Sequence, residues 1–264
     1  MKFILLFLVS ISALAGVPVD IVFDIDLTIV ANIPASGKDP LADPRNPLHG
    51  TVDIQFPKDG AVASERYRVF EGVRELMEKL RADPRVRVSF FSGGSEARNE
   101  ALLRSIKLPD GSSLWDLAGG RVYGRSSMSA TGKGSMFRIR DRFKKDLTRI
   151  NPDISDVIIV DDIKEFVPPS QSGHVLWIGE DFPFPERHHL TRPVTPELLA
   201  RERDKYRWIS SNLELAISER FRTGRPLSSL IGEFTANQTI TPFTRGLGGP
   251  GCAPGEIIGR LLAE

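Results

Sequence analysis

Two aspartates, Asp24 and Asp26, directly follow the short apolar run 21–23. Such a run predicts a buried strand, so both carboxylates lie where that strand ends. A carboxylate there loses solvent and gains a like-charged neighbour, and both effects disfavour ionisation unless a cation is close. The pair alone is more typical of aspartates that cap a turn, so a functional interpretation depends on groups elsewhere in the chain.

Groups of complementary chemistry accompany two later predicted strands. Ser92 and Gly93 follow one of them, and Asp161 and Asp162 follow the other, which Lys145 precedes. In an open parallel sheet, ligands bind beyond the carboxyl ends of the strands. We therefore expect these groups and the first aspartate pair to share one crevice.

This combination of groups indicates phosphoryl transfer through an aspartyl-phosphate. A carboxylate that attacks a phosphate meets like charge, so the site needs cations and directional donors. Mg²⁺ takes hard oxygen ligands, while a serine hydroxyl and a glycine N–H can donate to phosphoryl oxygens. A lysine balances the transition-state charge, and a second carboxylate serves as general acid and then base. Each residue alone is equally consistent with a turn cap, a loop serine or a solvated lysine.

The elements that must position these residues alternate between strands and helices. This order predicts an α/β fold with a doubly wound, Rossmann-like, mostly parallel sheet. The predicted sheet strands are 21–24, 87–91, 157–160 and 175–178, and a short strand is expected at 121–123 within a loop-rich segment. The predicted helices are 73–80, one that begins after Ser95, 143–150 and 196–222. A tail rich in Gly, Pro and Thr follows residue 224.

The helix predicted at 143–150 rests on an apolar stripe at helical spacing and ends before Pro152. It carries Lys144 and Lys145 and leads into the predicted strand 157–160. One of these lysines can therefore reach the crevice, and the local pattern favours Lys145. Lys133 is a more distant candidate.

A β-hairpin is predicted between the first two sheet strands. Its arms are the alternating segments 52–56 and 66–70, and the residues 57–60 between them are typical of a turn. A loop rich in Pro, Gly and Asp spans 32–50 before it. No segment up to Lys145 is long or regular enough for a large cap domain, and an open site admits a phosphate on a bulky molecule.

The first residues, 1–15, have the layout of a secretory signal peptide: Lys2, an uninterrupted apolar run, then the small-x-small pattern at 13–15. A buried N-terminal helix or strand and an uncleaved anchor are the alternatives. Export to the periplasm or beyond the cell is the expected localisation. The rest of the chain divides into an α/β domain at 16–182 and a helical extension with a tail at 183–264.

The composition of the 264 residues is that of a globular protein long enough for one full core with appendages. A net charge of +1 gives no reason to expect a nucleic acid partner. The single cysteine, Cys252, excludes an internal disulfide framework and disfavours a cysteine-based metal site. No stable membrane anchor is expected once the signal is removed, and the oligomeric state stays open.

The order and types of these residues resemble a known superfamily. The chain resembles the haloacid dehalogenase (HAD) superfamily of aspartate-nucleophile phosphatases, which is defined by four motifs. The segments that look like these motifs are Asp24-x-Asp26-x-Thr28, Ser92, a lysine, and Asp161-Asp162. A narrower similarity is to its C-terminal-domain-phosphatase branch, also called NLI-interacting-factor-like or FCP-like. The segments 70–73 and 145–162 carry that similarity, and the likeness extends over 19–178.

The resemblance implies a phosphatase that hydrolyses phosphate monoesters through an aspartyl-phosphate. Asp24 would be the nucleophile and Asp26 the general acid/base. Ser92 and Gly93 would bind the phosphoryl oxygens, and Lys145 would stabilise the phospho-intermediate. The implied fold is HAD-like, with a β-hairpin insert, no large cap and a C-terminal helical segment.

The resemblance also implies a Mg²⁺ site. Its ligands would be the side chains of Asp24 and Asp161 and the backbone carbonyl of Asp26, with Asp162 in support or bound through water. The chain departs from the branch at Leu27, where an acidic residue is usual, and by a serine in place of the threonine of the second motif. Neither departure removes a chemical group that the reaction needs.

Two classes of function remain open. The first is a phosphatase of phosphoproteins or other bulky phosphoesters, with a small-molecule or nucleotide phosphatase as its rival within the superfamily. The second is a catalytically idle binding protein that recruits a partner through its C-terminal helix, although a binder needs no complete catalytic set. Arg125 is a further candidate for phosphate binding. Other charged residues are assigned to solvated surfaces: His188, His189, Arg66, Arg68, Arg138, Arg140 and Arg142.

Overall fold

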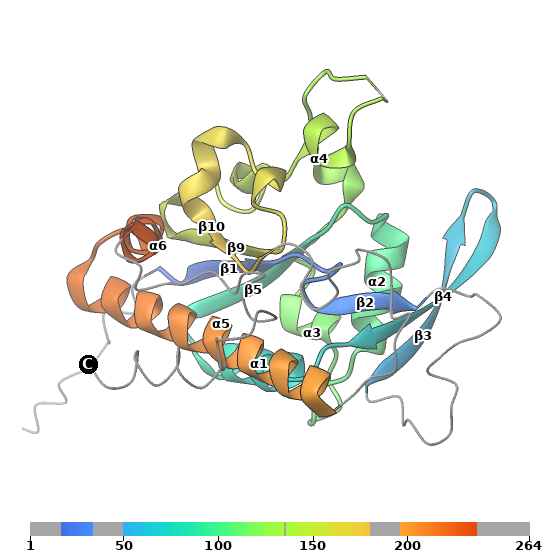
Figure 1. Cartoon of the computed structure of the whole chain (residues 1–264), viewed down its shortest axis with the longest axis horizontal. Helices are drawn as coiled ribbons and strands as arrows, with labels where there is room; N and C mark the ends of the chain where they lie inside the picture. The colour runs from blue at the N-terminus through green and yellow to red at the C-terminus, as the bar shows by residue number, and fades with distance from the viewer. Residues whose placement is uncertain (1–16, 34–49, 135, 180–195, 237–264) are drawn as a thin grey trace, which may run out of the picture.

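The computed structural model describes residues 17–33, 50–134, 136–179 and 196–236 (Figure 1). Several predictions concern residues outside these ranges: the signal peptide at 1–15, most of the loop at 32–50, His188, His189 and Cys252. None of the helices in the described ranges is long and apolar enough to cross a membrane.

The central sheet is parallel throughout, with the strand order β10-β9-β1-β5-β6. Its strands are β1 (Val19–Phe23), β5 (Val86–Phe91), β6 (Val122–Tyr123), β9 (Val157–Asp161) and β10 (Val175–Trp177). The predicted sheet strands are thereby confirmed. The chain first builds outward from β1 through β5 to β6 and then continues on the other side with β9. Because strand order reverses beside β1, the crevice beyond its carboxyl end is a topological switch point.

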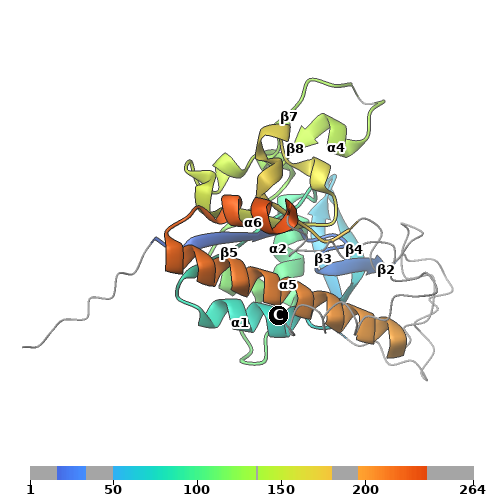
Figure 2. The ribbon, with the colours of Figure 1, turned by 60° about the vertical axis from the view of Figure 1, so that its left-hand side comes forward.

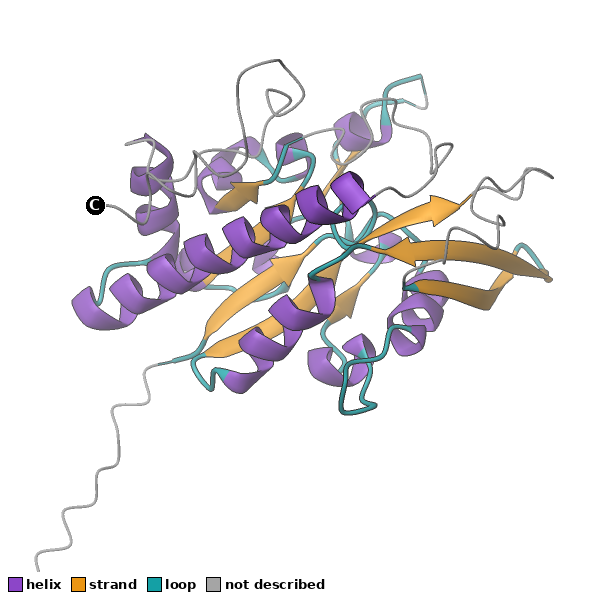
Figure 3. Ribbon diagram, turned by 60° about the horizontal axis from the view of Figure 1, so that its bottom comes forward, coloured by secondary structure: helices purple, strands orange, loops and turns teal. Residues whose placement is uncertain are grey.

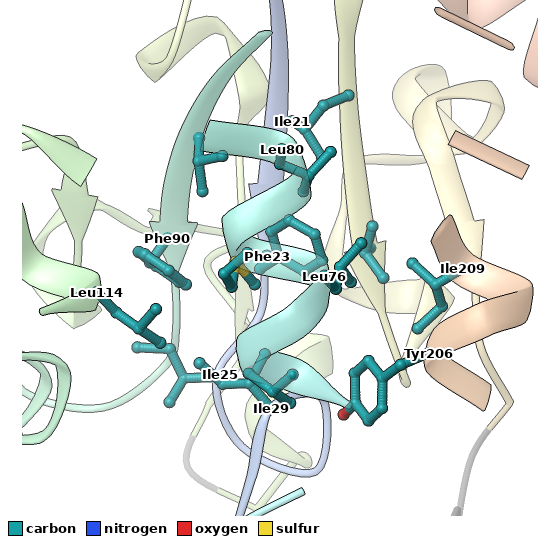
Figure 4. Close-up of a cluster of buried hydrophobic side chains, with 14 of the residues drawn as sticks. Ile21, Phe23, Ile25, Ile29, Leu76, Leu80, Phe90, Leu114, Tyr206 and Ile209 are labelled. Carbon is teal, nitrogen blue, oxygen red and sulfur yellow. The ribbon is translucent and has the colours of Figure 1, made fainter. Parts of the chain in front are cut away.

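Side chains of the sheet alternate between two hydrophobic layers. Ile21 and Phe23 contribute to one layer, while Val22 contributes to the other, as the period of two requires. The first layer is covered by α1 (Val73–Ala82), α2 (Glu96–Ser105), α3 (Leu114–Ala118), α5 (Pro196–Thr223) and α6 (Leu227–Ala236) (Figures 3 and 4). The second layer is covered by short 3₁₀ turns at η2 (Leu147–Arg149), η3 (Ile154–Asp156) and η4 (Lys164–Phe166).

The two helices after residue 195 belong to the same hydrophobic core as the sheet. α5 confirms the predicted C-terminal helix, and its buried stripe includes Tyr206, Ile209 and Leu213. α6 was not expected in the Gly-, Pro- and Thr-rich tail. Figure 2 shows α6 turning back alongside α5, where Leu227 and Ile231 enter the core.

The predicted hairpin is confirmed and gains a third strand. β3 (Thr51–Lys58) and β4 (Ala61–Val69) pair antiparallel, and β2 (Val30–Ile33) joins the other edge of β4. Asp59 and Gly60 both have positive φ, the conformation that closes two-residue hairpins. These strands form a small sheet of order β2-β4-β3. Among the described residues, this sheet is the only insert between β1 and α1.

The helix predicted at 143–150 is wrong. Residues Phe143–Lys144 form the short strand β8, which pairs with β7 (Ser129–Ala130), and η2 follows. The Asp146 side chain accepts hydrogen bonds from the Thr148 N–H and hydroxyl, and this local pairing competes with a helix. The segments around it are also short: η1 (Arg125–Ser127), α4 (Ile139–Arg142) and η5 (Pro169–His174).

Candidate active site

Three aspartates meet at the carboxyl ends of neighbouring strands. Asp24 follows β1, and its N–H donates to the Val160 carbonyl of β9 at 3.0 Å. Asp161 is the last residue of β9, and Asp162 follows it. One carboxylate oxygen from each aspartate lies within 4.8 Å of those of the other two, and all three side chains are buried. The parallel register of β1 and β9 therefore creates the predicted convergence.

Lys145 lies between two of these carboxylates. Its Nζ donates to Asp24 Oδ1 at 2.6 Å and to Asp161 Oδ2 at 2.7 Å, and the side chain is fully buried. An extended backbone places it there, since its N–H donates to the Phe166 carbonyl at 2.7 Å. The neighbouring Lys144 instead donates to the Glu165 carbonyl. The structure thus selects Lys145, although the residue does not lie on a helix.

Burial and mutual repulsion disturb the ionisation of this cluster. Burial raises the pKa of Asp24 to about 7, against the attraction of Lys145, and Asp161 raises it further. Burial also raises the pKa of Asp162 well above its usual range, with Asp161 and Asp24 adding to the effect. Burial alone would lower the pKa of Lys145, but the two carboxylates that it contacts hold it above the ordinary value. Lys145 is therefore charged at neutral pH, whereas burial and repulsion oppose the ionisation of Asp24 and Asp162.

Asp26 faces a different set of partners. Its carboxylate accepts hydrogen bonds from Ser92 Oγ at 3.0 Å and from both terminal nitrogens of Arg98, one of them at 3.0 Å. Burial raises the pKa of Asp26, but Arg98 and Ser92 outweigh it and hold that pKa below the usual value. With 46% of its side chain exposed, Asp26 is ionised and open to the crevice.

Arg98 was missed in the sequence. It lies in the first turn of α2, where Ser95 caps the helix by accepting from the Arg98 N–H. A Cβ at Gly94 would meet the Arg98 side chain at 2.9 Å, so this glycine leaves room for the guanidinium. An arginine one turn after the Ser-Gly-Gly segment was the signal available in the sequence.

Lys205 of α5 was also missed. The side chain is fully buried, and its Nζ lies 3.5 Å from the Leu27 carbonyl. Burial lowers the pKa of Lys205 to about 7, against the opposing charge of Asp162. The signal in the sequence was the helical spacing of Glu202, Lys205 and Ile209. It places two charged residues on the same face of the helix as the apolar residues that enter the core.

Arg68 corrects the expectation that the hairpin arginines are solvated. Its side chain is fully buried, and it forms an ion pair with the equally buried Glu202 of α5, with one hydrogen bond of 2.9 Å. Arg66 does lie partly exposed beside Asp53. Removing one partner of such a buried ion pair strongly destabilises a fold, so the pair anchors α5 to the hairpin.

The crevice is a cavity of about 620 Å³ bordered by the sheet ends, the hairpin and the segment after β5. Gly93 lies on its wall, as predicted, and the Gly93 carbonyl accepts from Arg125 Nε at 2.7 Å. The hairpin supplies Phe56 and Lys58, and Phe166 lies opposite from η4. The hairpin therefore forms one wall of the crevice, and the part of the chain that the structure describes contains no large cap.

The aspartate cluster fits a divalent cation. Its donors are carboxylate oxygens, which Mg²⁺ prefers, and a cation beside them would favour the ionised forms of Asp24 and Asp162, whose pKa values burial raises. The Asp26 side chain is directed to Arg98 and is not in the cluster.

Comparison with known proteins supports the fold. A structure of Fcp1, described as an essential RNA polymerase II CTD phosphatase, matches 83% of this chain and 71% of its own, with 16% identity and a TM-score of 0.54. The chain shares the fold of Fcp1. This confirms the predicted FCP-like fold.

A second structure is fission yeast Fcp1 bound to beryllium fluoride. It matches 93% of this chain and 62% of its own, with 17% identity and a TM-score of 0.48. No protein-family model matches the sequence, and no curated protein matches it.

Proposed function

We propose that this protein is a Mg²⁺-dependent phosphatase that hydrolyses phosphate monoesters through an aspartyl-phosphate at Asp24. One observation carries the proposal: Asp24 lies buried at a strand end, bound to Lys145 and grouped with Asp161 and Asp162. A carboxylate needs such positive charge around it before it can attack a phosphate dianion. The shared fold with Fcp1 is consistent with this chemistry.

In the first step, Asp24 forms a bond to phosphorus while the bond to the leaving oxygen breaks. Protonated Asp26 gives its proton to that oxygen. The two contacts from Arg98 favour the ionised form of Asp26, so they must open before Asp26 can take up this proton. Water then attacks the phosphorus, Asp26 takes the proton of the water, and Asp24 is released with inorganic phosphate. Lys145 stabilises the negative charge in both steps.

Mg²⁺ held by Asp24, Asp161 and Asp162, when bound, would neutralise charge on the phosphoryl oxygens. Gly93 lines the crevice together with Asp26, and the buried Ser92 donates its hydroxyl to the Asp26 carboxylate. The Ser92 hydroxyl and the Gly93 N–H are the donors that we assign to the phosphoryl group.

The pKa of Asp24 predicts how Mg²⁺ binding responds to pH. Because that pKa is about 7 without the ion, binding below pH 7 must displace a proton, whereas above it the carboxylate is already ionised. We expect the Mg²⁺ affinity to fall by at least about tenfold for each pH unit below that value, because Asp162, whose pKa burial also raises, must release its proton as well. Calorimetric titration in buffers of different ionisation enthalpy measures both the affinity and the proton release. An affinity that does not change across this range contradicts the assignment of Asp24 as a ligand.

Asp26→Asn tests the acid/base role. The substitution removes proton transfer, and we expect kcat for an alkyl phosphate to fall by about 10²–10⁴-fold. An aryl phosphate with a good leaving group needs less protonation, so its loss should be smaller. Steady-state rates with both substrates give the comparison. Equal losses for the two leaving groups contradict the role of Asp26.

For the substrate, we propose a phosphoprotein or another bulky phosphoester. The wall formed by the hairpin leaves the crevice open and carries both an apolar residue, Phe56, and a basic one, Lys58. Phosphate release from phosphopeptides, nucleotides and sugar phosphates, with and without a chelator, tests the substrate class. A preference for small metabolites contradicts it. No Mg²⁺-dependent release from any phosphoester would leave the idle binding protein as the better account.

A further inference from the structure

The turn that carries the two catalytic aspartates contains a strained residue. We call residues 24–30 the nucleophile turn. Leu27 within it has φ 61°, a left-handed conformation that a leucine rarely adopts. Such a conformation costs about 1–3 kcal/mol and persists only where surrounding contacts hold it. Among the described non-glycine residues, Asp59 in the hairpin turn is the other case of positive φ.

Part of the nucleophile turn is held by its own backbone. The N–H groups of Ile29 and Val30 donate to the Ile25 carbonyl at 2.9 and 3.1 Å, and the Leu27 N–H donates to the Val30 carbonyl at 2.8 Å. The carbonyls of Leu27 and Thr28 are contacted from a different part of the chain, 178 residues away.

Those contacts come from α5. Tyr206 Oη donates to the Thr28 carbonyl, and both residues are buried. Lys205 Nζ lies 3.5 Å from the Leu27 carbonyl. In Figure 4 the Tyr206 ring lies beside Ile29 with its hydroxyl directed toward the turn. A buried carbonyl requires a partner, so Tyr206 satisfies the Thr28 carbonyl that the turn leaves open, and Lys205 lies close to the carbonyl of the partly buried Leu27.

The contact continues to the nucleophile. Thr28 Oγ1 donates to Asp24 Oδ2 at 3.4 Å, so a single residue connects Tyr206 with Asp24. α5 is fixed one helical turn earlier, where Glu202 pairs with Arg68 and accepts from the Glu71 N–H at 2.9 Å. It also packs closely, since a Cβ at Gly72 would lie 2.9 Å from Tyr206 Cβ.

We propose that α5 is a positioning element of the active site, and that it holds the nucleophile turn through Lys205 and Tyr206. This inference rests on the phosphatase function proposed above. It assigns the C-terminal helix a role in orienting Asp24 and Asp26. A shift of about 1 Å in such groups costs a reaction up to about 10²-fold in rate.

Tyr206→Phe tests the proposal with the least disturbance, because the ring and its packing stay in place. We expect kcat for an aryl phosphate to fall by about 10–100-fold with KM changed by less than about twofold, since the contact acts on the reacting groups and not on substrate binding. Lys205→Met should act in the same direction. Hydrogen exchange at the Ile29 and Val30 amides should quicken by about tenfold or more.

Ile209→Val is the matched control, because it truncates a buried side chain one turn further along α5. It should lower stability by about 0.5–1.5 kcal/mol, yet leave kcat and the exchange of the nucleophile turn as in the wild type. The proposal is overturned if Tyr206→Phe changes neither kcat nor the exchange, or if Ile209→Val changes both equally. A wild type without any phosphatase activity refutes the proposed function instead. Hydrogen exchange alone then decides whether α5 holds the turn.

Discussion

Asp24→Asn is expected to lower kcat/KM for an aryl phosphate by about 10⁴-fold or more, because the attacking carboxylate is lost. The fold should survive, since the two side chains are nearly isosteric. Burial already raises the pKa of Asp24 to about 7, so the cost of burying this carboxylate opposes the gain from Lys145. We therefore expect the free energy of unfolding to stay within about 1 kcal/mol of the wild type.

Asp20→Asn is a control on the same strand. Asp20 is also buried, but it lies at the opposite end of β1, where it pairs with Arg87 at 2.6 Å. This substitution should leave kcat/KM of the folded protein unchanged. Rates of phosphate release and urea unfolding for both variants give the comparison. An Asp24→Asn protein that retains more than about a tenth of the wild-type activity contradicts a nucleophilic role.

Lys145→Met is expected to damage both stability and activity. Lys145 contacts two buried carboxylates, and its removal leaves Asp24 and Asp161 without their shared cation. Removing one partner of a buried ion pair costs about 3–5 kcal/mol, and we expect a loss of that size in the free energy of unfolding at neutral pH. The loss should shrink as the pH falls, because protonation of Asp24 relieves the repulsion. Turnover should be undetectable even where the variant is folded.

Lys144→Met is the control for this substitution. Lys144 precedes Lys145 but donates to the Glu165 carbonyl outside the aspartate cluster. Its loss should cost no more than about 1.5 kcal/mol and leave turnover intact. Urea unfolding at two pH values and phosphate release separate the two lysines. Equal effects on stability and activity in both variants contradict the assigned role of Lys145.

Most of the central sheet could be predicted, because its strands are short apolar runs. Val157 to Val160 and Ile21 to Phe23 are buried on both faces, and such parallel strands carry a continuous apolar signal. The helix predicted at 143–150 failed for a local reason. Its apolar residues have helical spacing, but the Asp146 side chain accepts a hydrogen bond from the Thr148 N–H. The preceding residue, Lys145, donates to the buried Asp24 carboxylate.

The candidate site could be predicted where its residues end strands, since the parallel sheet brings those ends together. Asp24, Asp161 and Lys145 therefore meet as expected. Arg98 and Lys205 could not be found in this way, because they lie on helices whose docking is decided by packing. Lys205 reaches the nucleophile turn only because α5 crosses the same face of the sheet as α1 (Figure 3).

The proposed mechanism requires that a phosphoryl group passes through the carboxylate of Asp24. Rapid acid quenching of the wild type during turnover of a radiolabelled aryl phosphate, followed by peptide mapping, tests it most directly. We expect acid-stable, base-labile label on the peptide that contains Asp24, and no label in Asp24→Asn. Asp26→Asn should retain the label for longer, because the general base of the second step is missing. Label on a different residue, or rapid phosphate release without any labelled peptide, contradicts the account.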